Sequence, residues 1–245
     1  MSRVVAVVQA RMGSSRLPGK SLVRLGDKPL IDHVVSRAHL ASLVDDVVVA
    51  VPSSPEDDIL AEHVRAHGLA AVYRGSSDDV LGRIVGAAKT LKGDVVVRLT
   101  ADDPFKDPEI IDLLVKRLLG DTSLAFVNNV ASKSFPEGLD VEVARYETLQ
   151  SISACPLSPY DREHVTAALY RDPVEFPSHS LSWSEDLISW RLTLDTPRDR
   201  VFLDAVACEV NRRGAGEDLE TLVSLIRGSR ELCRMMPRST RFRET

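Results

Sequence analysis

Short apolar runs alternate with amphipathic stretches from the beginning of the chain. Continuous Val- and Ala-rich runs such as Val4–Val8 are typical of strands that are buried on both faces. Stretches such as Pro29 to Val44 carry their apolar residues at helical spacing. Strands that alternate with helices of about 10–15 residues indicate a mostly parallel sheet with helices on both faces. We therefore expect a three-layer α/β fold, with strands at Val4–Val8, Val47–Val51, Ala70–Tyr73, Val95–Leu99, Leu124–Asn128 and Arg191–Leu194.

The alternation breaks between about residues 129 and 189. This part is rich in proline, and one helical pattern lies around Arg162–Tyr170. We interpret it as an insertion or lid that packs near the strand ends, and not as an independent domain. The chain, residues 1–245, is then a single domain. We expect its tail after Pro237, with Arg238, Arg241 and Arg243, to be frayed.

Composition narrows the class of protein. The hydrophobic content of 44% is enough for a sizeable core, and a net charge of −5 argues against general nucleic-acid binding. The longest apolar run, Val47–Val51, is far shorter than the roughly 20 residues that cross a bilayer. The N-terminus enters the first strand without a signal-peptide pattern. Since three scattered cysteines also fit no disulfide framework, we expect a cytoplasmic protein that binds neither nucleic acid nor membrane.

The loop after the first strand has the composition of an anion site. Glycine and serine let backbone N–H groups approach an anion, and arginine and lysine supply positive charge. Its spacing is neither that of a P-loop nor Gly-x-Gly-x-x-Gly. A flexible, solvated basic turn is the alternative interpretation. The candidate residues of this loop are Ala10, Arg11, Gly13, Ser14, Ser15, Arg16 and Lys20.

Two further strand ends carry carboxylates. Asp102 and Asp103 are adjacent after Val95–Leu99, and neighbouring carboxylates require a cation or hydrogen-bond donors. Mg²⁺ bound to nucleotide phosphates suits them, because Mg²⁺ usually takes one or two protein carboxylates. Asp195 follows Arg191–Leu194 and would complete the metal site with Asp102 at the same edge of the sheet. The alternative is that these aspartates cap the helices that follow them.

At this point an opening signature and four further motifs, in order along the chain, resemble those of a known family. The opening Gln-Ala-Arg-Met-Gly-Ser-Ser-Arg-Leu-Pro-Gly-Lys resembles the signature of the cytidylyltransferases that activate acidic sugars, which include the 3-deoxy-manno-octulosonate and acylneuraminate enzymes. Within that superfamily the chain most resembles the spore coat polysaccharide biosynthesis protein F group. The further motifs are Arg-Leu-Thr-Ala-Asp-Asp-Pro (98–104), Pro-Glu-Gly-Leu-Asp-Val-Glu-Val (136–143), Asp-Arg-Glu-His-Val-Thr (161–166) and Arg-Leu-Thr-Leu-Asp-Thr-Pro (191–197).

The resemblance implies a nucleotide-diphospho-sugar transferase fold, which is Rossmann-like and GT-A-like. It also implies CTP as co-substrate, Mg²⁺ as cofactor and pyrophosphate as product. By position, Arg11 and Lys20 match the residues that hold the triphosphate, whereas Asp102 and Asp195 match the two metal ligands. Related enzymes commonly pair through the inserted segment, so a homodimer is expected. Ala101 departs from the pattern, because such sequences commonly have glycine there.

The acceptor sugar is expected in a pocket that the inserted region supplies. Asn128 offers an amide for sugar hydroxyls, and Asp140 and Glu142 alternate along one extended segment. Arg162 could pair with a substrate carboxylate, and His164 could act as a general base. Polar support of the loop and an interior histidine are the alternatives. The nucleotide set also includes Arg98, the acceptor set includes Glu163, and for Tyr160 and Trp183 we favour core packing.

The resemblance implies transfer of CMP from CTP to a sugar, expected to be an acidic 2-keto-3-deoxy sugar, in surface polysaccharide biosynthesis. Such a transfer is an in-line displacement that depends on positioning and charge neutralisation. A GT-A-like glycosyltransferase is the alternative enzyme, although it would usually carry an Asp-x-Asp motif where this chain has Asp102 next to Asp103. A non-catalytic nucleotide-binding regulator is the third possibility.

Overall fold

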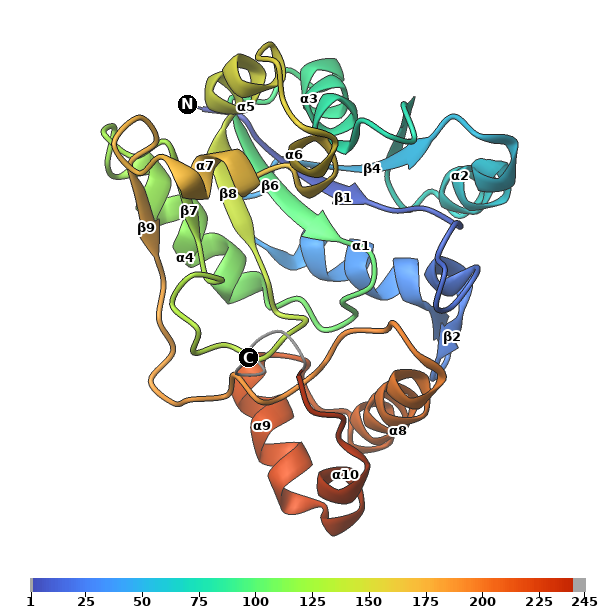
Figure 1. Ribbon diagram of the computed structural model, residues 1–245. Coiled ribbons are helices and arrows are strands. Elements are labelled where there is room, and N and C mark those ends of the chain that lie inside the picture. The colour runs from blue at the N-terminus through green and yellow to red at the C-terminus, as the bar shows by residue number, and fades with distance from the viewer. Residues whose placement is uncertain (1, 240–245) are drawn as a thin grey trace.

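The computed structural model describes residues 2–239 and is built on a seven-stranded sheet of order β5-β4-β1-β6-β8-β7-β9 (Figure 1). Its neighbouring strands pair in parallel, except where β8 runs antiparallel to β6 and β7. The mostly parallel α/β sheet expected from the sequence is therefore confirmed. The strands are β1 (Val4–Gln9), β4 (Asp46–Pro52), β5 (Ala71–Gly75), β6 (Val95–Thr100), β7 (Phe126–Asn128), β8 (Glu142–Arg145) and β9 (Ser178–Ser180), beside a small hairpin of β2 (Arg24–Leu25) and β3 (Lys28–Pro29).

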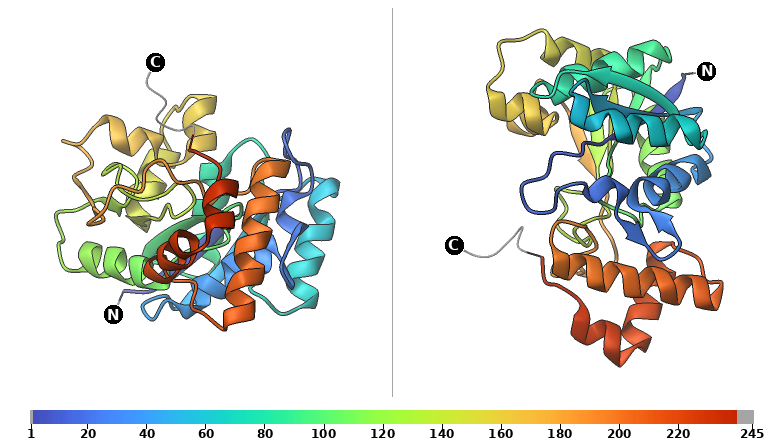
Figure 2. Two further views of the ribbon diagram at one scale, coloured as in Figure 1. Left: turned by 90° about the horizontal axis from the view of Figure 1, so that it is seen from below. Right: turned by 90° about the vertical axis from the view of Figure 1, so that its right-hand side faces the viewer.

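Helices cover both faces of the sheet. On one face lie α1 (Leu30–Leu40), α2 (Asp58–Ala66) and α4 (Pro108–Leu119), and on the other lie α3 (Val80–Thr90) and α5 (Tyr146–Ser153). The short helices α6 (Pro159–His164) and α7 (Ala167–Arg171) follow α5. At the end of the described chain, α8 (Pro197–Arg213), α9 (Leu219–Gly228) and α10 (Arg230–Met235) gather at one end of the molecule (Figure 2). Two 3₁₀ turns, η1 (Lys20–Leu22) and η2 (Pro55–Asp57), lie in the loops after β1 and β4.

The central strand β1 supplies both hydrophobic cores. Val4, Ala6 and Val8 belong to the core that α1 and α4 complete, whereas Val5 and Val7 belong to the core that α3 and α5 complete. Side chains alternate between the faces of a strand, so a strand buried on both sides is apolar at every position. That is why the run Val4–Val8 predicted its strand from sequence alone.

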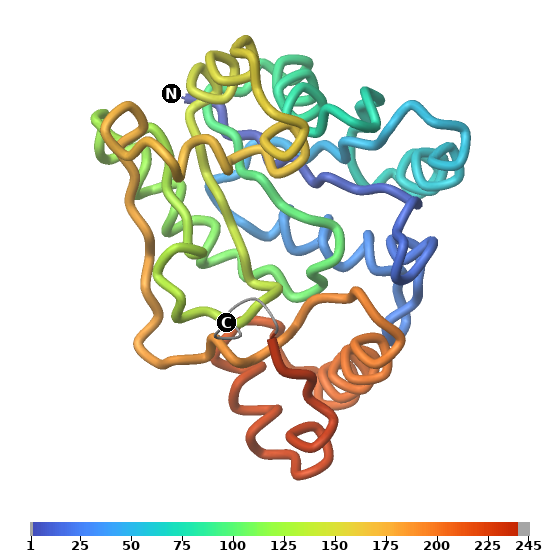
Figure 3. The backbone as a smooth tube through the Cα atoms, viewed as in Figure 1, coloured from blue at the N-terminus to red at the C-terminus, as the bar shows by residue number. Residues whose placement is uncertain are grey.

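The predicted strand at Arg191–Leu194 is wrong. This segment is a loop whose backbone bonds go to two other loops: Leu192 N–H donates to the carbonyl of Glu137 at 2.7 Å, and Leu194 N–H to that of Asp102 at 2.8 Å. Leu192 and Leu194 are nevertheless fully buried. The apolar alternation that predicted a strand shows only that Leu192 and Leu194 are buried, and a loop can bury side chains as well as a strand can. Figure 3 shows this stretch of backbone passing beside the loop that follows β6.

The region from 129 to 189 is only partly an insertion, because its strands β8 and β9 belong to the central sheet. The helix expected around Arg162–Tyr170 is interrupted at Val165, where φ is 56° and ψ is −69°. Thr166 N–H donates to the carbonyl of His164 at 2.6 Å, which closes a strained γ-turn. The two short helices α6 and α7 lie on either side of it.

The expected frayed tail is wrong at its beginning. Arg238 forms a backbone bridge with Trp190, and the Ser239 hydroxyl donates to Glu137 at 2.7 Å. Arg241 and Arg243 lie outside the described residues. Within residues 2–239, no helix combines the length and apolar character needed to span a membrane.

Candidate active site

Two adjoining cavities open at the carboxyl ends of β1 and β6. The smaller cavity, about 330 Å³, is lined by the loop after β1. The larger cavity, about 700 Å³, lies against the beginning of β8 and the helices α6 and α7. Parallel α/β sheets bind ligands at this edge. Four residues line both cavities: Thr100, Asp102, His164 and Asp195.

The loop after β1 is held in place by its own backbone. Gly19 has φ of +73° and its N–H donates to the carbonyl of Met12 at 2.9 Å, so the chain turns back and η1 begins at Lys20. Met12 N–H in turn donates to the buried Asp57 carboxylate at 2.6 Å. These bonds do not fit the alternative of a flexible, solvated turn. The loop residues that line the smaller cavity are Ala10, Arg11, Gly13, Ser14, Ser15, Arg16 and Lys20, as the sequence predicted.

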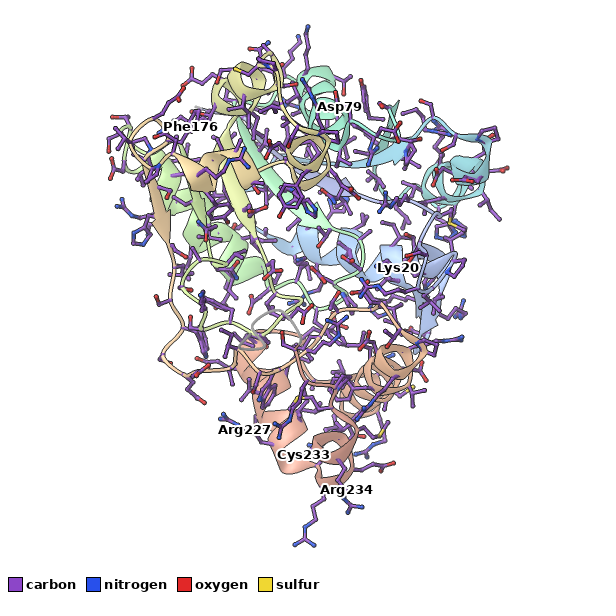
Figure 4. The ribbon with its side chains drawn as sticks, viewed as in Figure 1. Lys20, Asp79, Phe176, Arg227, Cys233 and Arg234 are labelled. Carbon is purple, nitrogen blue, oxygen red and sulfur yellow. The ribbon has the colours of Figure 1, made fainter. Side chains whose placement is uncertain are left out.

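Lys20 lies between the two aspartates that the sequence paired (Figure 4 labels Lys20). Its Nζ donates to Asp102 Oδ2 at 2.9 Å and to Asp195 Oδ1 at 2.7 Å. Burial alone would lower the pKa of Lys20, but the two carboxylates outweigh it and raise that pKa above its ordinary value. Burial would likewise raise the pKa of Asp102, and the Lys20 charge outweighs it and lowers that pKa. Asp102 is therefore held as a carboxylate.

Helix capping, the alternative role for the aspartates, falls to other residues. Thr196 caps α8 and forms a reciprocal capping box with Asp199. Asp107 caps α4, and its carboxylate also accepts from the N–H of Leu219 at 2.9 Å. Asp195 instead accepts from Arg191 at 2.8 Å and pairs with Arg16 at 3.0 Å, in addition to its bond with Lys20. Its place is at the centre of a cationic cluster.

Asp102 and Asp195 are ligands of the type that Mg²⁺ prefers, and their number is the number of protein carboxylates that Mg²⁺ commonly binds. Mg²⁺ commonly binds one or two protein carboxylates and completes its coordination with phosphate oxygens and water. Asp102 and Asp195 offer two, held together by a shared ammonium group. Among residues 2–239, no cluster of three or more His, Cys, Asp or Glu side chains could cage a metal by itself. The donor set thus fits a metal that arrives with a phosphate ligand.

Arg83 is a basic residue of the smaller cavity that the sequence analysis missed. It is buried, and its Nε has no hydrogen-bond partner within the described residues. Burial lowers the pKa of its guanidinium, and the charge of Arg11 lowers it further. An anion in this cavity would relieve both effects. Arg83 lies one turn inside α3, so it does not stand at a strand end, where ligand-binding residues are expected from sequence.

Two ion pairs tie helix α6 to the loop after β1 and to the beginning of α3. Arg11 pairs with Glu163 at 3.3 Å, and Arg162 pairs with Asp79, the N-cap of α3, at 3.3 Å (Figure 4 labels Asp79). Arg162 lines neither cavity, so its guanidinium is directed to Asp79 and away from the expected substrate position. Glu163 and His164 line the smaller cavity.

Glu142 organises the floor of the larger cavity. It forms an ion pair with Arg98 and accepts from Thr166 Oγ1 at 2.7 Å and from the Tyr170 hydroxyl at 2.8 Å. Burial and the Glu142 charge raise the pKa of Tyr170 well above its ordinary value, so Tyr170 remains a hydrogen-bond donor. Asp140 and Arg98 line the same cavity. Thr166 and Tyr170 were missed from sequence, because only the fold brings them to Glu142.

Two expectations for the acceptor region need revision. Asn128 is buried and its Oδ1 accepts from the N–H groups of Val130 and Ala131, both at 2.9 Å, so the geometry favours support of the loop. Core packing of Tyr160 is wrong, because this ring is 61% exposed, lines the larger cavity and lies 4.2 Å from the His164 ring. Trp183 packs against Phe135 at 5.8 Å, as expected.

Comparison with known proteins agrees with this geometry. The family model of the cytidylyltransferases matches residues 5–230. The spore coat polysaccharide biosynthesis protein SpsF of Bacillus subtilis is 33% identical over 221 residues, which cover 87% of this chain and 90% of SpsF. The 3-deoxy-manno-octulosonate cytidylyltransferase of Anaeromyxobacter sp. (strain Fw109-5) is 40% identical over 127 residues, 51% of this chain and 50% of that enzyme.

The similarity extends to three dimensions. A cytidylyltransferase structure from Leptospira borgpetersenii superposes with a TM-score of 0.87 at 29% identity, covering 99% of this chain and 100% of that one. The shared fold therefore extends over nearly the whole chain. Together with the family match over most of the sequence, this places the chain in the cytidylyltransferase family.

Proposed function

We propose that this cytidylyltransferase transfers CMP from CTP to an acidic 2-keto-3-deoxy sugar, with Mg²⁺ as cofactor and pyrophosphate as product, in surface polysaccharide biosynthesis. The observation that carries the proposal is the pair of cavities that share Asp102 and Asp195. A donor and an acceptor bound on either side of these carboxylates would meet there. The names of the relatives support the substrates, because they are a polysaccharide biosynthesis protein and a 3-deoxy-manno-octulosonate cytidylyltransferase.

The smaller cavity is the proposed CTP site. Arg11, Arg16 and Lys20 would neutralise the triphosphate, and Gly13 with its neighbouring serines would offer backbone N–H groups. Binding of phosphate oxygens gives Arg11 and Lys20 new partners in place of Glu163 and the aspartates. Positive charge at this position stabilises the departing pyrophosphate, which is where negative charge accumulates in the transition state.

The larger cavity is the proposed acceptor site. Glu142 and Asp140 are placed to accept hydrogen bonds from sugar hydroxyls, and Tyr170 and Thr166 hold the Glu142 carboxylate in position. Tyr160 offers an exposed ring face on which a sugar can lie. His164 lies where the two cavities meet and can accept the proton of the attacking hydroxyl. Mg²⁺, held by Asp102 and Asp195, would neutralise the α-phosphate and lower the pKa of that hydroxyl.

A pyrophosphate-release screen tests the proposal. Each of CTP, UTP, ATP and GTP is mixed with 3-deoxy-manno-octulosonate or N-acetylneuraminate, with Mg²⁺ or with excess chelator, and calorimetry reports the four nucleotide affinities. We expect release with CTP only, dependent on both metal and sugar. Tighter binding of a purine nucleotide would overturn the nucleotide assignment. Consumption of a nucleotide sugar in place of its formation would favour the glycosyltransferase, and binding without release would favour the regulator.

We further propose that the chain works as a single-domain homodimer in the cytoplasm. Val174, in the 129–189 region, is 88% exposed and is a candidate for an interface between copies. All three cysteines are exposed free thiols, which is typical of proteins in a reducing compartment. Light scattering at micromolar concentration should give the mass of two chains, and a mass of 26.9 kDa would refute the dimer.

A further inference from the structure

Lys106 is a lysine with no exposed surface. Its side chain is 0% exposed, in the loop between β6 and α4, and it lines neither cavity. Its Nζ donates to Asp103 Oδ2 at 2.7 Å and also to the backbone carbonyl of Asp140. The Thr100 hydroxyl donates to the same Asp103 oxygen at 2.6 Å. Lys106 and Asp103 together therefore join the end of β6, the loop after it and the segment that leads into β8.

Burying this ion pair is costly for folding. Taking a carboxylate and an ammonium group out of water costs several kcal/mol per ion, and well-packed apolar residues are often as stable. What the pair provides is a fixed geometry. The backbone of Lys106 is fixed as well, because the buried Arg37 of α1 donates from Nε to the Lys106 carbonyl at 2.7 Å.

The two segments that Lys106 joins, the loop after β6 and the segment that leads into β8, both contribute residues to the site. Asp102 follows Thr100 by two positions and lies on the boundary of the two cavities. Asp140 and Glu142 line the larger cavity, and the Asp140 carbonyl is the atom that Lys106 binds. A shift of the 137–142 segment would thus move the floor of the acceptor cavity relative to Asp102. The smaller cavity draws no residue from that segment.

We propose that Lys106 is a positioning residue for the acceptor, and that it fixes the 137–142 segment against the end of β6. The proposal rests on the assignment of the larger cavity to the acceptor. Misplacement of a bound reactant by about 1 Å costs about 10²-fold in rate, so a rigid tie between the two sides matters for transfer. Lys106 acts through Asp140 and Asp103, and it does not contact the sugar.

Lys106→Met tests the tie, because methionine keeps most of the length of the side chain and loses the charge and the donors. The matched control is Lys116→Met, the same change at an exposed position of α4. Lys106→Met also leaves the Asp103 carboxylate buried without its partner, which lowers stability. The double variant Asp103→Leu/Lys106→Met removes both charges and should recover the melting temperature. Because Asp103 itself lines the larger cavity, Asp103→Asn with Lys106 intact is the reference for sugar binding.

Two measurements on the folded double variant separate positioning from stability. Without any sugar, amide hydrogen exchange in residues 137–142 should be faster than in the wild type, whereas α4 keeps its protection. With 3-deoxy-manno-octulosonate as probe, the KM for the sugar should be about tenfold or more higher in the double variant than in Asp103→Asn, while the KM for CTP differs by less than about twofold. Lys116→Met should match the wild type in both.

The outcomes distinguish the two proposals. Unchanged exchange in residues 137–142, or a sugar KM of the double variant no higher than that of Asp103→Asn, overturns the positioning role. If the wild type itself does not turn over 3-deoxy-manno-octulosonate, the proposed acceptor is wrong. The exchange measurement then still decides whether Lys106 holds the segment.

Discussion

The backbone N–H of Leu194 donates to the backbone carbonyl of Asp102 at 2.8 Å. This bond sets the residue after Leu194, which is Asp195, beside Asp102, although neither belongs to a strand. Lys20 then bridges the two carboxylates with its ammonium group. The centre of the site thus depends on a contact between two loops. The loop of Asp102 directly follows strand β6, whereas the loop of Asp195 does not directly follow a strand.

Removal of either carboxylate should nearly abolish turnover. Asp102→Asn and Asp195→Asn keep the size of the side chain and remove one charge, so kcat should fall by about 10²-fold or more. Asp195→Asn should also lower the melting temperature more than Asp102→Asn does, because Asp195 pairs with Arg16, Lys20 and Arg191 together. Pyrophosphate release and thermal melting measure the two effects.

The exposed Asp186→Asn serves as a control for these variants and should leave both properties unchanged. Near-normal turnover of Asp102→Asn at saturating Mg²⁺ would contradict the metal assignment. Equal melting temperatures of the two site variants would contradict the cationic cluster around Asp195.

Lys20→Met should change how stability depends on alkaline pH. The pKa of Lys20 is raised in the folded protein, so its charge stabilises the fold below the ordinary value of 10.5. That contribution is lost as the pH rises through the folded-state pKa. The difference in melting temperature between wild type and Lys20→Met should therefore be larger at about pH 8 than at about pH 11. A difference that grows with pH would show that the bridge to the aspartates does not stabilise the fold.

Glu163→Gln should tighten CTP binding slightly. Arg11 and Glu163 are both about half exposed, so their ion pair adds little to stability. In Glu163→Gln, Arg11 has no ion pair to break before it binds a phosphate group, so CTP binding no longer includes that cost. Calorimetry with CTP should show a Kd lower by about two- to fivefold, with an unchanged melting temperature. Glu185→Gln, which removes the surface partner of Arg227, is the control. Weaker CTP binding by Glu163→Gln would mean that Glu163 contacts the nucleotide directly.

Because Val165 lies in a γ-turn with positive φ, we expect glycine to be tolerated at this position at least as well as alanine. Val165 is fully buried and has positive φ, which costs a β-branched residue about 1–3 kcal/mol. Val165→Ala loses burial, by about 2–3 kcal/mol, and keeps the strain. Val165→Gly loses slightly more burial and relieves the strain. Denaturant unfolding should therefore find Val165→Gly at least as stable as Val165→Ala, and a clearly less stable glycine variant would show that the turn is not strained.

Much of the fold follows from local sequence. The runs Val4–Val8 of β1 and Val47–Val51 of β4 are apolar at every position because both faces of these strands are buried, and this marks them without knowledge of their neighbours. The loop after β1 was recognised from its glycines, serines and basic residues, and all seven of its candidates line the smaller cavity. The same reasoning failed for residues 191–194, because apolar alternation records only that side chains are buried.

By itself, then, the sequence determined the layered α/β architecture and the loops at which ligands would bind, since both depend on residues close together in the chain. Only the tertiary structure decided which loops touch. It places Lys20 between Asp102 and Asp195, directs Arg162 to Asp79, and brings Lys106 to the backbone carbonyl of Asp140. A buried charge must find its partner wherever the packed chain brings one within hydrogen-bond distance. Such pairings join distant residues, so no local pattern records them.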